Sequence, residues 1–148
     1  MNIVAGVLIL IASAAIGAAI NNMYLARVKT AEELYKYVVF SQSEISFFRT
    51  EIVAMNEKYA SGSGNDDFKK LLNGTSAGGA AQSTAKLFND FTWGLSKLDL
   101  SSQKEFTDTY LGFVNDEIAA LKKDSEVKGK LFKRLSPVLG VAIFILVL

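Results

Sequence analysis

The residue types that carry most protein chemistry are scarce in this chain. Its 148 residues include no cysteine and no histidine, so there is no thiol nucleophile, no imidazole base and no sulfur or imidazole ligand for zinc. The neighbouring carboxylates Asp66 and Asp67 could hold a divalent cation with loop oxygens, although two acidic residues in the first turn of a solvated helix give the same pattern. We therefore predict a protein that is not an enzyme and that needs no metal or cofactor.

The glycine-rich stretch 73–79 is the other segment whose composition suggests chemistry. Phosphate-binding loops follow a strand and end in Gly-Lys-Ser or Gly-Lys-Thr, and neither feature is present around residues 73–79. The net charge of the chain is only +1, whereas nucleic-acid binding needs a basic surface. We expect a plain linker here and no nucleic-acid partner.

The positions of the charged residues are more informative than their sum. All 16 basic and 15 acidic residues lie between Arg27 and Arg134, and a charge at the centre of a bilayer helix costs about 2.5–3.5 kcal/mol. We predict an all-α protein with three parts. An N-terminal transmembrane helix (1–26) and a short C-terminal transmembrane helix (135–148) would flank a cytoplasmic helical bundle domain (27–134).

The two apolar ends differ in length. The run 3–20 would span about 27 Å as a helix, which matches a hydrocarbon core of about 30 Å. A cleaved signal peptide is the alternative, because residues 17–19 resemble a cleavage site, but no basic residue precedes the run. The last segment reaches about 21 Å, so it would cross only with local bilayer thinning and with Lys133 and Arg134 extended to the headgroups. Pro137 is expected in the first turn of that helix.

Orientation and packing can be predicted from the residues of these segments. Basic residues follow the first segment and precede the second, and neither terminus carries one, so the middle domain should face the cytoplasm. Small residues, which let a second membrane helix approach closely, are candidates for helix packing: Gly6, Ser13, Gly17 and Gly140. Small residues are also common in membrane spans without any packing role, and both explanations stay open.

The middle of the chain has a helical periodicity. The spacing of Thr30 and Glu33 fits a capping box and predicts a helix start. One long helix with a buried seam should follow, because apolar residues recur at steps of three and four. The seam residues are Leu34, Val38, Ser41, Ile45, Phe48, Ile52, Met55 and Tyr59. This seam would form the core of the domain or, alternatively, a coiled coil between chains.

Further helices are expected over 66–72, over about 80–98 with Trp93 in the core, and from a second capping box at Ser102. The buried stripe of that last helix should contain Phe106, Tyr110, Phe113, Val114, Ile118 and Leu121. Beyond Leu121 the polar run to Lys130 should carry the helix out of the bundle to the membrane.

Several short motifs occur in a fixed order between the two apolar ends. They are the segment 44–50 (Glu-Ile-Ser-Phe-Phe-Arg-Thr) with Ile52, then Leu98-Asp99 with Gln103, then Leu131-Phe132 through Leu139-Gly140-Val141. This order resembles the stage III sporulation protein AB family of endospore-forming bacteria over nearly the whole chain. The sequence departs from the family pattern at Glu51, where the family usually has Pro, at Ser136 and at 94–97.

The resemblance implies a non-enzymatic scaffold in the bacterial cell membrane, on the mother-cell membrane that faces the forespore. Such a subunit belongs to a secretion-like channel needed for endospore formation and is similar to the inner-membrane platform proteins of type II secretion. It implies a cytoplasmic secretion-type ATPase and other channel subunits as partners, and a homo-oligomer is also open.

The family positions that would contact partners are Glu44, Arg49, Thr50, Asp99 and Gln103. Each of them would serve equally well in a structural role, as one half of a surface ion pair or as a helix cap. The alternative function is a membrane-tethered regulatory or signalling anchor that binds one soluble partner through the face of Phe40 and Phe47.

Overall fold

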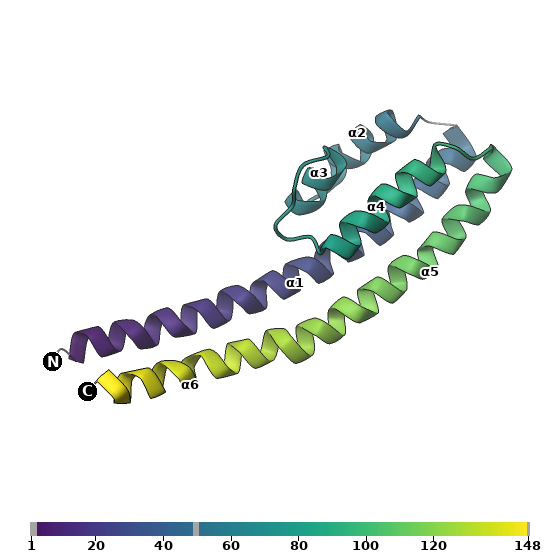
Figure 1. The fold of residues 1–148 in the computed structure, drawn as a ribbon. Helices are drawn as coiled ribbons and strands as arrows, with labels where there is room; N and C mark the ends of the chain where they lie inside the picture. The colour runs from purple at the N-terminus through teal and green to yellow at the C-terminus, as the bar shows by residue number, and fades with distance from the viewer. Residues whose placement is uncertain (1–2, 49–50, 148) are drawn as a thin grey trace. The chain divides into compact units, whose positions relative to one another are not determined.

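The computed structural model describes residues 3–48 and 51–147, and Figure 1 shows them as helices joined by loops, of which the longest spans residues 73–81. In chain order these are α1 (Ile3–Phe48), α2 (Ile52–Gly62), α3 (Asp66–Leu72), α4 (Gln82–Leu95), α5 (Leu100–Asp124), the π-helix η1 (Ser125–Gly129) and α6 (Lys130–Val147). No strand occurs in these two ranges. The prediction of an all-α protein is confirmed.

The chain forms two compact units. The first joins the segments Met1–Ala26 and Leu121–Leu148, and the second is Arg27–Ala120. Helix α1 therefore contributes its first half to one unit and its second half to the other. Residues 121–134, which were predicted to belong to the middle domain, group with the terminal segments in this division.

Helix α1 passes through Thr30 without a break, so the helix start predicted there is wrong. A capping box satisfies free amides at a helix start, and the amides around Thr30 lie well inside α1. The Thr30 hydroxyl instead donates to the carbonyl oxygen of Gly79 at 3.0 Å. This hydrogen bond ties α1 to the loop that precedes α4.

The predicted seam is divided between two helices. Helix α1 ends at Phe48 and α2 begins at Ile52, after Glu51 in an extended conformation, so the single helix predicted to Tyr59 is wrong. Residues on both sides of this break still share one core, because Leu34, Val38 and Met55 are all fully buried. The periodicity identified the buried positions but not the interruption.

The core of the second unit is largely aromatic. Tyr37 lies at its centre, with ring centroids of Tyr59, Phe68, Phe88 and Phe91 between 5.3 and 6.1 Å away. Such pairs contribute about 0.5–1.5 kcal/mol each beyond the burial of apolar area. Rings from α1, α2, α3 and α4 therefore meet in one cluster, which holds these four helices together.

Two aromatic residues lie outside the core that the sequence predicts for them. Trp93 is 65% exposed and Phe113 is 51% exposed. Trp93 is two residues from both Phe91 and Leu95, which places it about 200° round α4 from these buried side chains. Its ring instead makes a cation–π contact with Lys97, whose Nζ atom lies 3.5 Å from the ring centroid.

The end of the chain is one continuous helical path through α5, η1 and α6. Pro137 lies well inside α6, which begins at Lys130, so its predicted place in the first turn is wrong. Proline has no N–H to donate to the carbonyl four residues earlier, yet α6 continues to Val147. Membrane helices tolerate an interior proline where neighbouring groups satisfy the freed carbonyl.

Within the part of the chain that the structure describes, one helix is long and apolar enough to cross a membrane. It is α1, whose most apolar 18-residue window has a mean hydropathy of 2.7. Helix α6 carries Lys130, Lys133 and Arg134 among its 18 residues and does not meet the same criterion. A terminal pair of membrane helices therefore stays a prediction.

Candidate functional site

The four small residues singled out for helix packing all lie where the two terminal segments touch. Gly140 faces the side chain of Ser13, and Gly6 faces the ring of Phe144 so closely that a Cβ atom at either glycine would collide with its neighbour. A Cβ atom on Gly17 would lie 2.7 Å from the Cβ atom of Ser136 and 2.9 Å from the Phe132 carbonyl oxygen. The role of these contacts inside a bilayer stays a prediction.

These contacts define an antiparallel hairpin of two helices. Gly6 contacts Phe144, Ser13 contacts Gly140 and Gly17 contacts Ser136. Later residues of α1 therefore contact earlier residues of α6, so the two helices run in opposite directions. Further along, Gly129 contacts Asn21 and Tyr24. Gly17 is the least tolerant of a side chain among these positions, because a Cβ atom there would meet the backbone oxygen of Phe132, and small residues let two helices approach this closely.

The outward surface of the hairpin is apolar. Large aliphatic residues from both terminal segments have side chains that are more than half exposed: Ile3, Val4, Leu8, Ile11, Ile16, Val138, Leu139, Ile145 and Leu146. Contiguous exposed apolar surface of this kind marks a site of contact with lipid or with protein.

Glu44, the first of the predicted partner-contact residues, lies inside the second unit. Its side chain is only 5% exposed and accepts a hydrogen bond from Lys58 Nζ at 2.6 Å. Lys58 comes from α2 and also lies 5.7 Å from the Phe40 ring centroid. The pair joins α1 to α2, so the structure gives Glu44 a structural role on the inside of the bundle.

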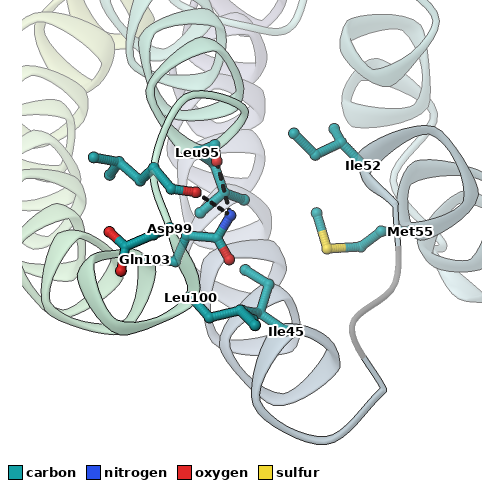
Figure 2. A pocket seen from close by; sticks show the side chains of 8 residues that line it. Ile45, Ile52, Met55, Leu95, Asp99, Leu100 and Gln103 are labelled. Carbon is teal, nitrogen blue, oxygen red and sulfur yellow. Dashed lines mark hydrogen bonds between the residues drawn. The ribbon is translucent and has the colours of Figure 1, made fainter.

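Asp99 and Gln103 lie together at the junction of α4 and α5, beside a hollow of about 480 Å³. The hollow is lined mainly by apolar side chains: Ile45, Ile52, Met55, Leu95, Leu98 and Leu100. In Figure 2, Ile52 and Met55 lie on one side and Ile45, Leu100 and Gln103 on the other, whereas the Asp99 carboxylate points away from Met55. Gln103 is therefore the polar side chain that faces this apolar space.

The amide of Gln103 has a defined structural task. Its Nε2 atom donates to the carbonyl oxygens of Leu95, at 3.0 Å, and of Leu98, at 3.1 Å, as the dashed lines in Figure 2 mark. Leu95 is the last residue of α4, where helices have unsatisfied acceptors, and Leu98 lies in the connection that follows. Gln103 thus caps α4 from α5.

Asp99 precedes α5 and prepares its first turn. Its carbonyl oxygen accepts the backbone N–H of Gln103 at 2.9 Å, and its carboxylate accepts the hydroxyl of Ser101. Hydrogen bonds from Ser101 and Ser102 hold the pKa of the Asp99 carboxyl below its usual value. Helix α5 begins at Leu100, two residues before the predicted Ser102 capping box.

The other predicted contact residues are outside the part of the chain that the structure describes. Arg49 and Thr50 are not among the described residues, and of Phe47 only the backbone is described. Phe40 is half-buried, and its ring lies 5.3 Å from that of Tyr59. Since α2 covers it in this way, Phe40 offers little surface to a soluble partner.

A polar cluster that the sequence did not reveal links α1 to the end of α2. The carboxylate of Glu33 accepts hydrogen bonds from Ser63 Oγ at 2.8 Å, from Tyr59 at 3.1 Å and from Lys36 at 3.1 Å. Burial alone would raise the pKa of Glu33, but these hydrogen bonds and the charge of Lys36 together hold it below its usual value. Only the tertiary fold brings Tyr59 and Ser63, which are 26 and 30 residues away in sequence, to this carboxylate.

Metal binding gains no support from the described side chains, since no group of three or more His, Cys, Asp or Glu residues is placed to hold an ion. Asp66 and Asp67 instead face Lys69 and Lys70 one turn later, at 3.9 and 3.8 Å. Asn65 caps this helix by accepting the N–H of Phe68 at 2.9 Å. Asp66 and Asp67 thus lie in the first turn of a capped helix.

Neither a protein-family model, nor a curated protein, nor a solved structure matches this chain. The resemblance to the sporulation family therefore depends on the quoted motifs alone.

Proposed function

We propose that this chain is a non-enzymatic membrane scaffold, in which the terminal hairpin anchors the helical domain Arg27–Ala120 at the cytoplasmic face. By the resemblance of its motifs, it would serve as a platform subunit of a secretion-like mother-cell-to-forespore channel. A cytoplasmic secretion-type ATPase and other channel subunits would be its partners.

The proposal of a membrane anchor is supported mainly by the contrast between the two faces of the hairpin. The inner face is closed by glycine and serine contacts, while large aliphatic side chains cover the outer face. Only 11% of the most apolar window of α1 is buried, which is unlike the core helix of a soluble protein. Burial of this apolar surface in lipid would be favourable by about 25 cal/mol per Å².

The absence of cysteine and histidine favours a scaffold over an enzyme. The family positions Glu44, Asp99 and Gln103 join or cap helices, so their geometry is explained without a reaction. A helical domain with a shared aromatic core suits a protein that holds partners in place.

The regulatory anchor is the second candidate, and the Phe40 contact with Tyr59 weighs against its proposed binding face. Gene context separates the two functions, because a neighbouring gene for a secretion-type ATPase supports the channel. An isolated gene in an organism that forms no endospores would contradict it.

The biochemical test has two steps. First, the protein expressed in its source cells should stay in the membrane pellet through extraction with alkaline carbonate, which removes peripheral proteins. Second, a tagged chain purified in mild detergent should recover an ATPase or a second membrane subunit. Release by carbonate would refute the anchor, and recovery of the chain alone would refute the platform role.

A further inference from the structure

The charged residues of the terminal hairpin all lie in one short stretch, residues 121–134. Residues 3–26 and 135–147 carry no charge, whereas 121–134 hold six basic and two acidic residues, a net charge of +4. The basic residues are Lys122, Lys123, Lys128, Lys130, Lys133 and Arg134. We call the stretch 121–134 the basic collar.

The basic side chains of the collar point away from the packed face of the hairpin. Leu121, Ser125 and Gly129 are the buried positions of this stretch, and Gly129 contacts Asn21 and Tyr24 of α1. All six basic residues are exposed. The fold therefore presents the positive charge outward, around the point where the small-residue contacts of the hairpin end.

The π-helix η1 contributes to this arrangement. Lys128 binds the Asp124 carboxylate at 3.0 Å, so one of the two acidic residues is already engaged within the collar. A π-helical segment adds a residue to a turn, and it thereby rotates the later residues of the path about the helix axis. Lys130, Lys133 and Arg134 then occupy the first turns of α6, next to its uncharged part.

The collar is directly continuous with exposed apolar surface. Leu131 and Leu135 are about half exposed among these basic residues, and Val138 and Leu139 come next at about 60%. On the opposing helix, Asn21 and Tyr24 lie level with Gly129, and uncharged residues fill the chain before them. Positive charge beside an apolar band fits a surface whose interior is hydrocarbon and whose boundary is anionic.

We propose that the basic collar is a binding site for anionic phospholipid headgroups, with Lys130, Lys133 and Arg134 as its main contacts. Basic clusters of this size next to a membrane helix attract anionic lipid, and long basic side chains reach the headgroups while their stems stay in apolar surroundings. This inference rests on the proposed membrane anchor. It adds that the anchor selects the lipids around it.

The test compares two spin-labelled lipids around the full-length protein reconstituted in phosphatidylcholine vesicles. Electron spin resonance gives the fraction of labelled phosphatidylglycerol and of labelled phosphatidylcholine that the protein immobilises. Each basic side chain near an anionic headgroup changes the association constant about fivefold. We expect phosphatidylglycerol to be preferred by about fivefold or more at 0.1 M salt, and this preference should shrink at 1 M salt because the Debye length falls from about 10 Å to about 3 Å.

The triple variant K130Q/K133Q/R134Q should bring the two lipids to nearly equal association. The matched control is K69Q/K70Q/K86Q, which removes the same charge from α3 and α4 of the second unit and should keep the preference. Circular dichroism should show unchanged helix content in both variants, since all six side chains extend from helix surfaces.

Each outcome decides a different point. If the protein enters the vesicles but immobilises both lipids equally, the collar binds no anionic lipid and the membrane anchor still stands. If the triple variant keeps the full preference, the selectivity comes from other residues and the inference is wrong. If the protein floats with neither neutral nor anionic vesicles, the proposed anchor itself fails.

Discussion

Gln103 is a predicted partner-contact residue for which the structure also gives a structural explanation. Its amide donates to the carbonyl oxygens of Leu95, the last residue of α4, and of Leu98 in the connection to α5. It also lies beside the hollow lined by Ile45 and Met55. A partner that docks at this hollow would contact the same side chain. Substitution separates the two roles, because loss of the structural role lowers the stability of the isolated protein, whereas loss of a contact role does not.

We expect Gln103→Ala to lower the free energy of unfolding by about 1–3 kcal/mol, since two net hydrogen bonds of about 0.5–1.5 kcal/mol each are lost. The measurement is urea unfolding of the full chain in detergent, followed by circular dichroism at 222 nm. Gln82→Ala, at the exposed first residue of α4, is the control and should change stability by less than about 0.5 kcal/mol. Unchanged stability of Gln103→Ala, together with loss of a co-purifying partner, would make Gln103 a contact residue instead.

Glu33 gives a prediction in the acid range. Its folded pKa lies below the ordinary value of 4.5, so the unfolded chain takes up a proton more readily than the folded one. The stability that this carboxylate contributes is present above the unfolded pKa and is lost as pH falls through the folded pKa. Glu33→Gln should therefore cost about 1–2 kcal/mol at pH 7 and should flatten the loss of stability below about pH 4.5.

The measurement for Glu33 is a series of urea titrations from pH 7 to pH 3 on the two proteins. Glu57→Gln, at an exposed position of α2, is the control and should follow the parent curve. If the free energy of unfolding depends on pH in the same way for Glu33→Gln and its parent, the hydrogen bonds from Tyr59 and Ser63 do not stabilise the charged carboxylate.

For single residues, the sequence predicts which positions are buried better than it predicts the hydrogen-bond partners of polar side chains. Leu34, Val38 and Met55 are predicted as seam residues and are fully buried. Thr30 and Glu33 are predicted to bind each other as a capping box, yet they bind Gly79 and Ser63. Apolar burial follows local periodicity, whereas a hydroxyl or carboxylate binds the groups that the fold brings near it.

At the scale of helices, the sequence conceals both the interruption before α2 and the continuity of α1, for physical reasons. Amides inside a helix bind the carbonyls of the preceding turn and need no cap, and α1 continues through residues 26–30. Conversely, the steps of three and four continue from Ile45 to Ile52 and Met55 although the helix ends at Phe48. Periodicity reports the face that is buried and is insensitive to a change of helix axis.

The hairpin contacts predict a strong effect at Gly17. A leucine there would place its Cβ atom 2.7 Å from the Ser136 Cβ atom and 2.9 Å from the Phe132 carbonyl oxygen, and a backbone oxygen cannot move aside cheaply. Gly17→Leu should therefore force α1 and α6 apart. Ala15→Leu adds the same side chain at an exposed position of α1 and serves as the control.

Disulfide crosslinking in membranes measures this separation. The chain has no cysteine, so Tyr24→Cys with Gly129→Cys gives one defined pair. A Cβ atom on Gly129 would lie 3.4 Å from the Tyr24 Cβ atom, close to the separation that a disulfide needs. Crosslinking should be efficient in this pair alone and with Ala15→Leu, and should fall at least severalfold with Gly17→Leu. Equal yields in all three proteins would show that the glycine contact does not hold the hairpin.

At the scale of the whole molecule, the distribution of charge is the strongest guide. The uncharged ends and the charged middle separate the terminal segments from the bundle before any helix is placed, and the compact units divide close to the same residue at Ala26. The second boundary differs, at Ala120 in place of Arg134. The sequence hides it because α5, η1 and α6 form one unbroken helical path, in which no loop marks a change of unit.

The proposed topology makes the last prediction, that the helical domain faces the cytoplasm and both termini face the other side. Gly64→Cys suits the test because Gly64 is exposed and no atom lies near the position of its Cβ, unlike the neighbouring Ser63, which is buried against Glu33. A maleimide that cannot cross bilayers should label Gly64→Cys only in inverted vesicles or after permeabilisation, and should label Leu148→Cys from outside intact cells.

The basic residues of the collar supply the physical reason, since an excess of Lys and Arg beside a membrane segment is retained on the cytoplasmic side. Replacing Lys130, Lys133 and Arg134 by Gln should therefore raise the fraction of chains with Leu148→Cys left inside, while the K69Q/K70Q/K86Q control should not. Labelling of Gly64→Cys from outside intact cells would place the domain on the wrong face for a cytoplasmic ATPase. The platform role would then be excluded even if the hairpin itself were fully inserted.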